Sequence, residues 1–315
     1  MNKKMRVLLT GGAGFIGSHV SDMLINNGHE VIVIDNLSSG KEENLNPKAV
    51  LYKEDIRDSA VEEIMERERP EAVIHHAAQV SVRDSVEDPL YDMDVNIGGT
   101  LNLLENSVKN GIKKFIFAST GGAIYGEQNC FPADETHPTK PLSPYGITKL
   151  TCEKYLYYYH KTYGLNYVSL RYSNVYGPRQ DPYGEAGVVA IFSQKMLAGD
   201  QPIINGSGEQ TRDYVFVEDV ARANALTLEG DVIGEFNIGT GIETTVNGLF
   251  REIKTLAESE VKSVYRKAKK GEQFRSVLDW SKAKRGLGWN PEISLKEGLK
   301  QTLAFFRVNY SERIK

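Results

Sequence analysis

The sequence is short of cysteine and has no long apolar run. Its 315 residues include only two cysteines, Cys130 and Cys152, which lie far apart and show no paired spacing. We therefore predict neither a disulfide framework nor a zinc site. No apolar stretch approaches the roughly 18 residues of a membrane span, and the N-terminus lacks the apolar segment and cleavage site of a signal peptide. We expect a cytoplasmic protein without a metal centre or a membrane partner.

A strong excess of charge is also missing. The chain has 38 Lys and Arg against 42 Asp and Glu, for a net charge of −4, and nucleic-acid partners usually require a strongly basic surface. The apolar share of 40% and the charged share of 25% are ordinary for a globular protein. The length allows one large domain or two modest ones, and no nucleic-acid partner is expected.

The first 35 residues contain a pattern typical of dinucleotide binding. A short strand predicted to be buried, at 6–10, leads into glycines spaced G-x-x-G-x-x-G at Gly11, Gly14 and Gly17, and a helix and a second strand follow. Glycine allows the backbone to approach a pyrophosphate, which then lies at the helix N-terminus. Asp35 ends the second strand, where a carboxylate accepts from the ribose hydroxyls. Because an acid repels a 2′-phosphate, NAD is favoured over NADP, and a purely structural glycine turn is the weaker alternative.

Strands and helices continue to alternate as far as residue 174. Further strands are predicted at 49–52, 72–74, 114–118 and 167–170, with helices at 62–67, after Pro89 and after Ser143. This alternation is typical of an α/β fold with a doubly wound parallel sheet. Such sheets bind ligands beyond the C-terminal ends of their strands. We therefore expect one edge of the sheet to gather Gly11, Asp35, Asp55, Gln79, Thr120 and Asn174.

The pattern changes after residue 174. Residues 175–185 are predicted as a loop, and a helix at 188–197, a turn at 205–208 and a short strand at 236–239 follow. We expect one domain made of 1–174 together with about 214–239. A smaller discontinuous lobe would comprise 175–213 and 240–315. A cleft between the two is the default place for a ligand.

Tyr145 and Lys149 form a candidate acid–base pair at a helix start. Ser143 is a suitable N-cap, and Pro144 suits the first helical position. The spacing then places Tyr145 in the first turn and Lys149 one turn later on the same face. A neighbouring cation favours the phenolate form of tyrosine, which would bring its pKa nearer to working pH. The alternative is a packed tyrosine beside a solvated lysine.

Five motifs together resemble a known enzyme family. They are Thr10-Gly-Gly-Ala-Gly-Phe-Ile-Gly17, His76-Ala-Ala-Gln79, Tyr145-x-x-x-Lys149, Arg171-Tyr-Ser-Asn-Val-Tyr-Gly-Pro178 and Arg212-Asp-Tyr-Val-Phe-Val217. Over roughly residues 5–305 the chain resembles the extended short-chain dehydrogenase/reductases. Within them it is most similar to nucleotide-sugar epimerases that act at C4 of UDP-glucose and UDP-galactose. The resemblance implies a Rossmann-type domain and a substrate-binding lobe.

The resemblance also implies a reaction. Tyr145 would take the proton from the sugar 4-hydroxyl while C4 gives its hydride to bound NAD. The 4-keto sugar would then rotate and take the hydride back on its other face. Lys149 would bind the nicotinamide ribose and help to ionise Tyr145. Asn174 and Arg212 would hold the diphosphate, although Arg212 could instead be a surface arginine paired with Asp213.

The resemblance implies two sets of contacts. The cofactor contacts would be Gly11, Gly14, Phe15, Ile16, Gly17, Asp35, Asn36, Asp55, Ile56, Ala77, Ala78, Gln79, Asn96, Tyr145 and Lys149. The substrate contacts would be Thr120, Tyr145, Asn174, Arg212, Glu272, Arg275 and Ser276. His75 and His76 are more simply explained as structural histidines at a strand end.

Two departures from the family pattern concern the strand end at Thr120. The usual hydroxyl position is Gly121 here, so the catalytic hydroxyl must come from Thr120 or Ser119, and we choose Thr120 because a Thr-Gly-Gly form occurs in some of these epimerases. Related dehydratases and decarboxylases carry an acid just after the threonine. Gly121 and Gly122 offer none, which favours epimerisation.

Two further departures lie near residue 270. The family's Arg-x-Gly-Asp diphosphate contact is Lys269-Lys270-Gly271-Glu272 here, and lysine does not replace a bidentate arginine. Arg275 is a possible substitute. Ser276 stands at the position that limits the size of the sugar, and its small side chain suggests room for an N-acetyl group.

The leading prediction is an NAD-dependent UDP-hexose 4-epimerase. The alternatives are a 4-epimerase for a UDP-N-acetylhexosamine or UDP-glucuronate, a nucleotide-sugar dehydratase, and a non-catalytic NAD sensor on the same fold. In the family, the helix of Tyr145 and the helix after Pro89 pair across a dimer as a four-helix bundle. A homodimer is therefore expected.

Overall fold

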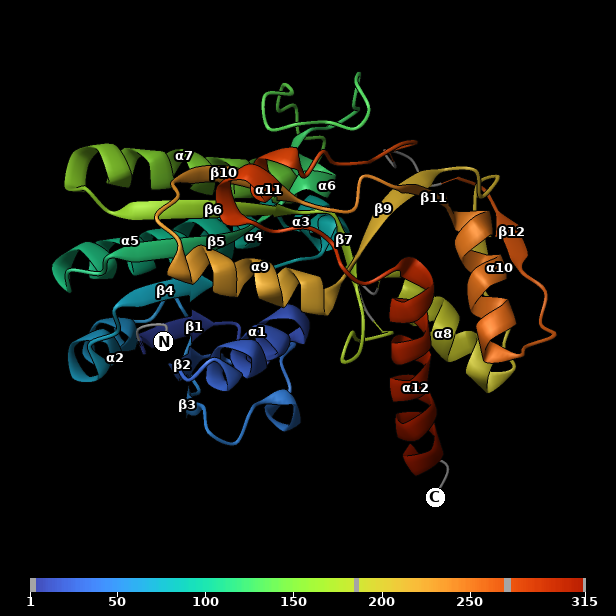
Figure 1. The fold of residues 1–315 in the computed structure, drawn as a ribbon, viewed down its shortest axis with the longest axis horizontal. Helices are drawn as coiled ribbons and strands as arrows, with labels where there is room; N and C mark the ends of the chain where they lie inside the picture. The colour runs from blue at the N-terminus through green and yellow to red at the C-terminus, as the bar shows by residue number, and fades with distance from the viewer. Residues whose placement is uncertain (1–3, 184–186, 269–272, 314–315) are drawn as a thin grey trace.

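A seven-stranded sheet forms the centre of the larger part of the molecule (Figure 1). The computed structural model describes residues 4–183, 187–268 and 273–313, with the backbone alone for 309–313. The strand order is β10-β6-β5-β4-β1-β2-β3, and every neighbouring pair is parallel. The strands are β1 (Arg6–Thr10), β2 (Glu30–Ile34), β3 (Val50–Tyr52), β4 (Ala72–His75), β5 (Lys114–Thr120), β6 (Asn166–Tyr172) and β10 (Gly234–Ile238). The predicted doubly wound α/β fold is confirmed.

Helices cover both faces of this sheet because its strands are apolar on both sides. In β1, Val7 and Leu9 face one core while Leu8 faces the other, and all three are fully buried. One face carries α1 (Phe15–Asn26), α9 (Val217–Glu229) and α11 (Ser281–Leu287). The other face carries α2 (Ala60–Glu68), α5 (Gly99–Lys109) and α7 (Pro144–Tyr163).

The predicted helix after Pro89 consists of three joined pieces. These are α4 (Pro89–Met93), the π-turn η2 (Asp94–Gly98) and α5. A short helix, α3 (Val82–Glu87), precedes them. Single π-turns inside helices occur often at functional sites, and Asn96 lies within this one.

A smaller lobe lies beside the sheet, on the right in Figure 1. It contains β7 (Asn174–Tyr176), β9 (Thr211–Phe216) and β11 (Glu243–Thr245) in one sheet, and β8 (Ile203–Asn205) with β12 (Val264–Arg266) in another. Its helices are α8 (Val188–Ala198), α10 (Val246–Ala257) and α12 (Leu295–Arg313). Between β9 and β11 the chain returns to the larger part, where α9 packs on α1 and β10 pairs with β6.

The start of the loop predicted at 175–185 is instead a strand. Val175 and Tyr176 belong to β7 and pair with Val215 and Phe216 of β9. Tyr176 is buried, and its ring packs against Phe216. The prediction was wrong here because the strand depends on a partner 40 residues further on, which the Pro- and Gly-rich local sequence does not reveal.

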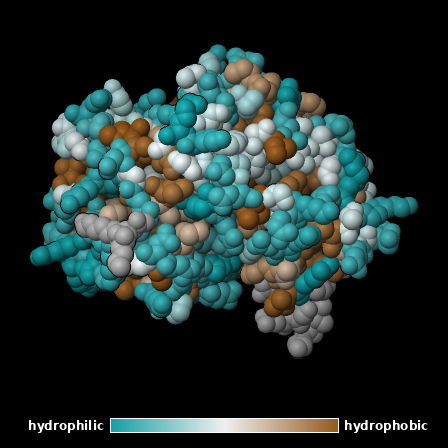
Figure 2. All heavy atoms as spheres, in the orientation of Figure 1, coloured by the Kyte–Doolittle hydropathy of each residue, from teal (hydrophilic) through white to brown (hydrophobic). Residues whose placement is uncertain are grey.

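The remaining elements and the surface complete the description. The short helices η1 (Glu42–Asn44) and α6 (Gly121–Ile124) connect longer elements. Hydrophilic side chains cover most of the face in Figure 2, and apolar ones are scattered among them in small groups. Within the described ranges, no helix has the length and apolar character to cross a membrane.

Candidate active site

The C-terminal ends of the parallel strands meet at one edge of the sheet. Thr10, the last residue of β1, is in register with Ile34 and His75, the last residues of β2 and β4. Thr120 at the end of β5 is in register with Tyr172 at the end of β6. The segments that follow these strands therefore start at the same edge, as expected for a ligand site in this fold.

The glycine turn after β1 is tightly packed and leaves the helix N-terminus open. Gly11 has φ +68°, and an added Cβ would lie 2.5 Å from the Ala77 nitrogen. A Cβ at Gly17 would overlap the Gly11 carbonyl oxygen. Helix α1 begins after Gly14 without a side-chain cap and without an acid in its first turn. This arrangement suits the pyrophosphate of a dinucleotide, because the amides and the helix dipole favour an anion.

Asp35 is fixed at the end of β2 beside this turn. The side chain is 7% exposed, and its carboxylate accepts the Ala13 and Leu37 amides, each at 2.9 Å. A carboxylate has about four acceptor positions, so these two bonds orient it and leave capacity for ribose hydroxyls. The residues present thus fit NAD.

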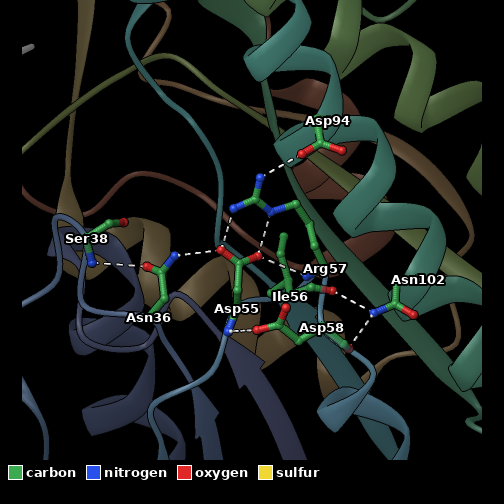
Figure 3. A network of polar contacts seen from close by, with 8 residues as sticks. All are labelled: Asn36, Ser38, Asp55, Ile56, Arg57, Asp58, Asp94 and Asn102. Carbon is green, nitrogen blue, oxygen red and sulfur yellow. Dashed lines mark hydrogen bonds and ion pairs between the residues drawn. The ribbon is translucent and has the colours of Figure 1, made fainter.

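Arg57 braces the next predicted cofactor residue, Asp55, as Figure 3 shows. The Asp55 carboxylate accepts Asn36 Nδ2 at 2.9 Å and Arg57 Nε and Nη2 at 2.9 and 2.8 Å. Arg57 Nη1 reaches Asp94 Oδ2 at 2.7 Å. The hydrogen bond from Arg57 is the main cause that lowers the pKa of Asp55 to about 2.

The same segment is held from a second side. Asn102 in α5 donates to the carbonyls of Ile56 at 2.8 Å and Asp58 at 3.1 Å (Figure 3). Residues 55–58 are therefore fixed to the helix that continues the π-turn.

The side-chain amide of Asn96 pairs with the backbone of Gln79. Asn96 Oδ1 accepts the Gln79 amide at 3.0 Å, and Asn96 Nδ2 donates to the Gln79 carbonyl at 3.1 Å. Asn96 is 2% exposed, so its side chain holds the loop after β4. A direct contact of Asn96, or of its neighbours in the motif, Ala77 and Ala78, with the cofactor stays a prediction.

The helix that carries the candidate acid–base pair begins as predicted. Ser143 Oγ accepts the Gly146 amide at 3.2 Å, and Pro144 occupies the first turn of α7. Lys149 is 3% exposed, and its Nζ donates to the Ala118 carbonyl at 3.0 Å. Nζ lies 6.0 Å from the centre of the Tyr145 ring. The pair therefore lies against the end of β5.

The expected lowering of the Tyr145 pKa is not found. Burial raises the Tyr145 pKa, and the nearby carboxylate of Asp92 raises it further. Burial also lowers the pKa of Lys149 to about 8, with smaller opposing contributions from Cys152 and Asp92. The reason is that the amine points toward the Ala118 carbonyl, and burial penalises both charged forms.

The two candidate hydroxyls at the end of β5, Ser119 and Thr120, differ in their burial and hydrogen bonding. Ser119 is 3% exposed and donates to Glu153 Oε1 at 2.6 Å. Glu153 in turn binds the guanidinium of Arg171 at 3.0 and 2.7 Å. Thr120, the next residue, is half-buried at the start of α6. This geometry favours Thr120 over Ser119 as the hydroxyl that can meet a ligand.

Gly121 is closed off from the side where related enzymes carry an acid. A Cβ at Gly121 would overlap Cδ1 of Leu278. Leu278 is itself fully buried, and its amide donates to Asp213 Oδ2 at 3.3 Å. An acidic side chain at 121 would therefore require Leu278 to move.

Arg212 does not pair with Asp213. Asp213 is buried and accepts the amides of Thr240 at 2.8 Å and Gly241 at 3.1 Å. Arg212 Nη1 donates to the Thr211 carbonyl at 2.7 Å. The alternative of an Arg212–Asp213 surface pair is therefore wrong.

The other predicted substrate residues lie on the smaller lobe. Asn174 begins β7 in register with Tyr214. Arg275 binds Glu243 in a bidentate ion pair at 2.9 and 2.7 Å and stacks 3.6 Å above the centre of the Phe131 ring. Ser276 is 3% exposed. The remaining predicted residue, Glu272, lies outside the described residues.

Three residues that the sequence reasoning missed take part in these networks. Arg57 follows the predicted Asp55 by two positions, and Glu153 follows Lys149 by four. Asp92 precedes Asn96 by four. In the two helices the signal was the spacing of one turn from a predicted residue, but a charged residue in a helix usually faces solvent, so the spacing alone was not decisive.

The sheet, the open glycine turn and the pair of half-buried Tyr145 and buried Lys149 define a dinucleotide-dependent enzyme of the short-chain dehydrogenase/reductase type. A family model described as the NAD dependent epimerase/dehydratase family matches residues 7–239. The chain belongs to this family.

Relatives with known names extend over nearly the whole chain. A crystal structure of UDP-glucose 4-epimerase with UDP-glucose from Thermotoga maritima is 56% identical, covers 97% of this chain and 100% of that one, and superposes with a TM-score of 0.96. The Thermus thermophilus UDP-glucose 4-epimerase in complex with NAD is 45% identical, with coverages of 96% and 99% and a TM-score of 0.92. A UDP-glucose 4-epimerase of Mycolicibacterium smegmatis is 42% identical, with coverages of 96% and 99%.

Proposed function

We propose that this protein interconverts UDP-glucose and UDP-galactose by NAD-dependent epimerisation at C4. The observation that carries the proposal is the pair of half-buried Tyr145 and buried Lys149 beside a strand end where an acid at Gly121 would displace Leu278. The names of the relatives at 56%, 45% and 42% identity support the same activity. They do not favour an N-acetylated sugar, UDP-glucuronate or a dehydratase reaction.

The cofactor would lie along the edge of the sheet. The open first turn of α1 would hold the pyrophosphate, Asp35 the adenosine ribose, and Asp55 with Ile56 the adenine. Lys149 and Tyr145 would adjoin the nicotinamide ribose. When bound, NAD supplies the acceptor and donor of the hydride at sugar C4.

Tyr145 would move the proton. Its phenolate takes the proton of the sugar 4-hydroxyl as C4 becomes a carbonyl, and the phenol gives the same proton back to O4 when the hydride returns to the opposite face. Because burial raises the Tyr145 pKa, ionisation depends on positive charge brought close to it. Lys149 would supply such a charge below a pH of about 8 once its amine turns from the Ala118 carbonyl toward Tyr145. Thr120 would donate a hydrogen bond to the reacting oxygen.

The smaller lobe would hold the nucleotide diphosphate. Asn174 and Arg212 are candidates, and a guanidinium suits phosphate oxygens in a bidentate arrangement. Arg275 is already paired with Glu243, so its contact with a diphosphate would require an exchange of partners. The division into an NAD-binding domain of 1–174 with about 214–239 and a substrate lobe of 175–213 and 240–315 is part of the same proposal, with the exception of α11, which packs on the sheet of the larger part.

We also propose a homodimer and a cytoplasmic location. Exposed apolar side chains on two adjacent helices support the dimer: Leu90, Tyr91 and Met93 of α4, and Ile147, Tyr157 and Tyr158 of α7. Light scattering should give twice the mass of the chain, and Leu90→Asp with Tyr158→Asp should give a monomer. The two free thiols, Cys130 and Cys152, agree with a reducing compartment.

The function is tested by NMR of the products formed from each UDP-sugar without added cofactor. UDP-glucose and UDP-galactose should interconvert without net NADH. A stable 4-keto-6-deoxy product or stoichiometric NADH would contradict the proposal. Comparable turnover of UDP-N-acetylglucosamine would instead support the alternative suggested by Ser276.

Tyr145→Phe separates an enzyme from an NAD sensor. An epimerase should lose nearly all turnover and retain its NAD. In a sensor, Tyr145→Phe should leave ligand binding unchanged, and the wild-type protein itself would show no turnover.

A further inference from the structure

A buried carboxylate joins three segments around the candidate active site. Asp92 in α4 is 0% exposed. Its Oδ2 accepts Thr148 Oγ1 of α7 at 2.8 Å. Its Oδ1 accepts Asn96 Nδ2 of the π-turn at 3.0 Å and Gln79 Nε2 of the loop after β4 at 3.2 Å. A buried charge held by three donors is costly to assemble unless every bond is made.

We propose that Asp92 is a positioning residue for the Tyr145–Lys149 pair. Through Thr148 it holds the first two turns of α7, and its charge controls the pH at which the pair takes and gives its proton. The inference rests on the proposed 4-epimerase function.

Thr148 transmits the position of Asp92 to the pair. It lies between Tyr145 and Lys149 in α7, and its Oγ1 is 3.0 Å from the Tyr145 carbonyl and 2.8 Å from Asp92. A hydroxyl has one hydrogen, and the shorter, charge-assisted bond goes to the carboxylate. That bond ties the rotation of α7 about its axis to α4, and so fixes the direction in which Tyr145 points.

Asn96 connects the same carboxylate to the loop after β4. Its amide group is already paired with the backbone of Gln79 at 3.0 and 3.1 Å. The bond from Asn96 to Asp92 therefore connects α7, the π-turn and the loop after β4. Such a fully bonded buried network specifies one arrangement of its members.

The other titratable groups near the pair are uncharged or neutralised. Burial is the main cause that lowers the pKa of the histidines at the end of β4 and raises that of the nearby thiol to about 11. The acid one turn along α7 is held in an ion pair with an arginine. These groups are His75, His76, Cys152 and Glu153 with Arg171. Burial raises the pKa of Asp92 itself, and the hydrogen bond from Thr148, the charge of Lys149 and the hydrogen bond from Asn96 oppose that rise and favour the carboxylate. Asp92 is thus the acid whose charge acts on the pair.

Asp92 acts in a defined direction on both members. After burial, its charge is the second cause that raises the pKa of Tyr145, and it opposes the fall in the pKa of Lys149. A carboxylate disfavours the phenolate and favours the ammonium. Removal of the charge should therefore lower both pKa values.

The test compares the pH dependence of kcat in three variants. Asp92→Asn keeps the shape and removes the charge, and both limbs of the bell-shaped profile should move to lower pH by roughly 0.5 to 1 unit. Thr148→Val keeps the charge and removes the donor, so kcat should fall roughly tenfold or more with the limbs in place. Asp84→Asn, an exposed acid in α3, makes the same charge change as a control and should match the wild type.

The inference would be overturned if the limbs of the pH profile did not move in a folded, NAD-containing Asp92→Asn protein. An unchanged kcat in Thr148→Val would overturn it as well, and so would a shift in Asp84→Asn equal to that in Asp92→Asn. A wild-type protein that fails to interconvert the two UDP-sugars would overturn the proposed function instead. In that case the ultraviolet titration of Tyr145, measured as the difference from Tyr145→Phe, reads the inference directly. The Tyr145 phenolate should form at a lower pH in the Asp92→Asn variant than in the wild-type protein.

Discussion

Glu153→Gln should destabilise the fold strongly. Glu153 is 1% exposed, and its carboxylate faces the buried guanidinium of Arg171 at 3.0 and 2.7 Å. The neutral amide removes the charge that compensates Arg171, although one acceptor remains for Ser119. Loss of one partner of a buried ion pair costs about 3–5 kcal/mol. For a chain of this length we expect Tm to fall by roughly 4 to 8 °C.

A double variant shows whether the charge is the cause. Glu153→Leu with Arg171→Met removes both charges and leaves apolar groups of similar size, an exchange that is often close to neutral in other proteins. The loss should be limited to the bonds of Ser119 and of Tyr125, about 1 kcal/mol each. The double variant should therefore be more stable than Glu153→Leu or Arg171→Met alone.

Urea unfolding followed by far-ultraviolet circular dichroism gives the free energies. The reasoning would be refuted by a loss below about 1 kcal/mol for Glu153→Gln, which would mean that water or another group compensates Arg171. It would also be refuted if the losses of Glu153→Leu and Arg171→Met simply added in the double variant.

Three further predictions concern the cofactor, the reaction and the pH dependence of stability. Arg57→Met should weaken NAD binding roughly tenfold, a loss equivalent to one charge-assisted hydrogen bond, because Asp55 loses the group that orients it. Measurement of the NAD dissociation constant checks this, and Lys109→Met at an exposed position is the control. Gly121→Asp should abolish epimerisation without giving a 4-keto-6-deoxy product by NMR, because its side chain displaces Leu278. For Lys149, whose pKa is lowered to about 8, the unfolded state binds the extra proton between pH 8 and the ordinary lysine pKa of about 10.4. Over that window the free energy of unfolding should rise by about 3 kcal/mol relative to Lys149→Met, and a flat difference would contradict the assigned burial.

The fold could be predicted because its signals are local. Residues 7–9 and 72–74 are continuous apolar runs, as strands covered on both faces must be. The glycine turn and Asp35 each depend on a few neighbouring positions. The start of α7 was predictable for the same reason, since Ser143 and Pro144 satisfy or remove the first amide donors of the helix.

The networks within the site could not be predicted because their members are distant in sequence. Asp92 meets Thr148 across 56 positions, and Arg171 meets Glu153 across 18. An acid in a helix ordinarily faces solvent, and only the packing of α4 on α7 shows that Asp92 does not. The pKa of Tyr145 was misjudged for a related reason, because the sequence places Lys149 one turn away but does not show that its amine points to Ala118.

The choice between Ser119 and Thr120 needed less than the full structure. Side chains of a strand alternate between its faces, so Ser119 shares a face with Phe115 and Phe117. Those two aromatic residues belong to the core beneath α5 and α7, so Ser119 must lie under α7, where an acid can hold its hydroxyl. Thr120 has the other parity, so it does not share that acid, and its half-buried position at the end of β5 makes its hydroxyl the candidate that can meet a ligand. The residues two and four positions away in the strand thus show on which face a hydroxyl lies, and so distinguish a structural hydroxyl from a candidate catalytic one.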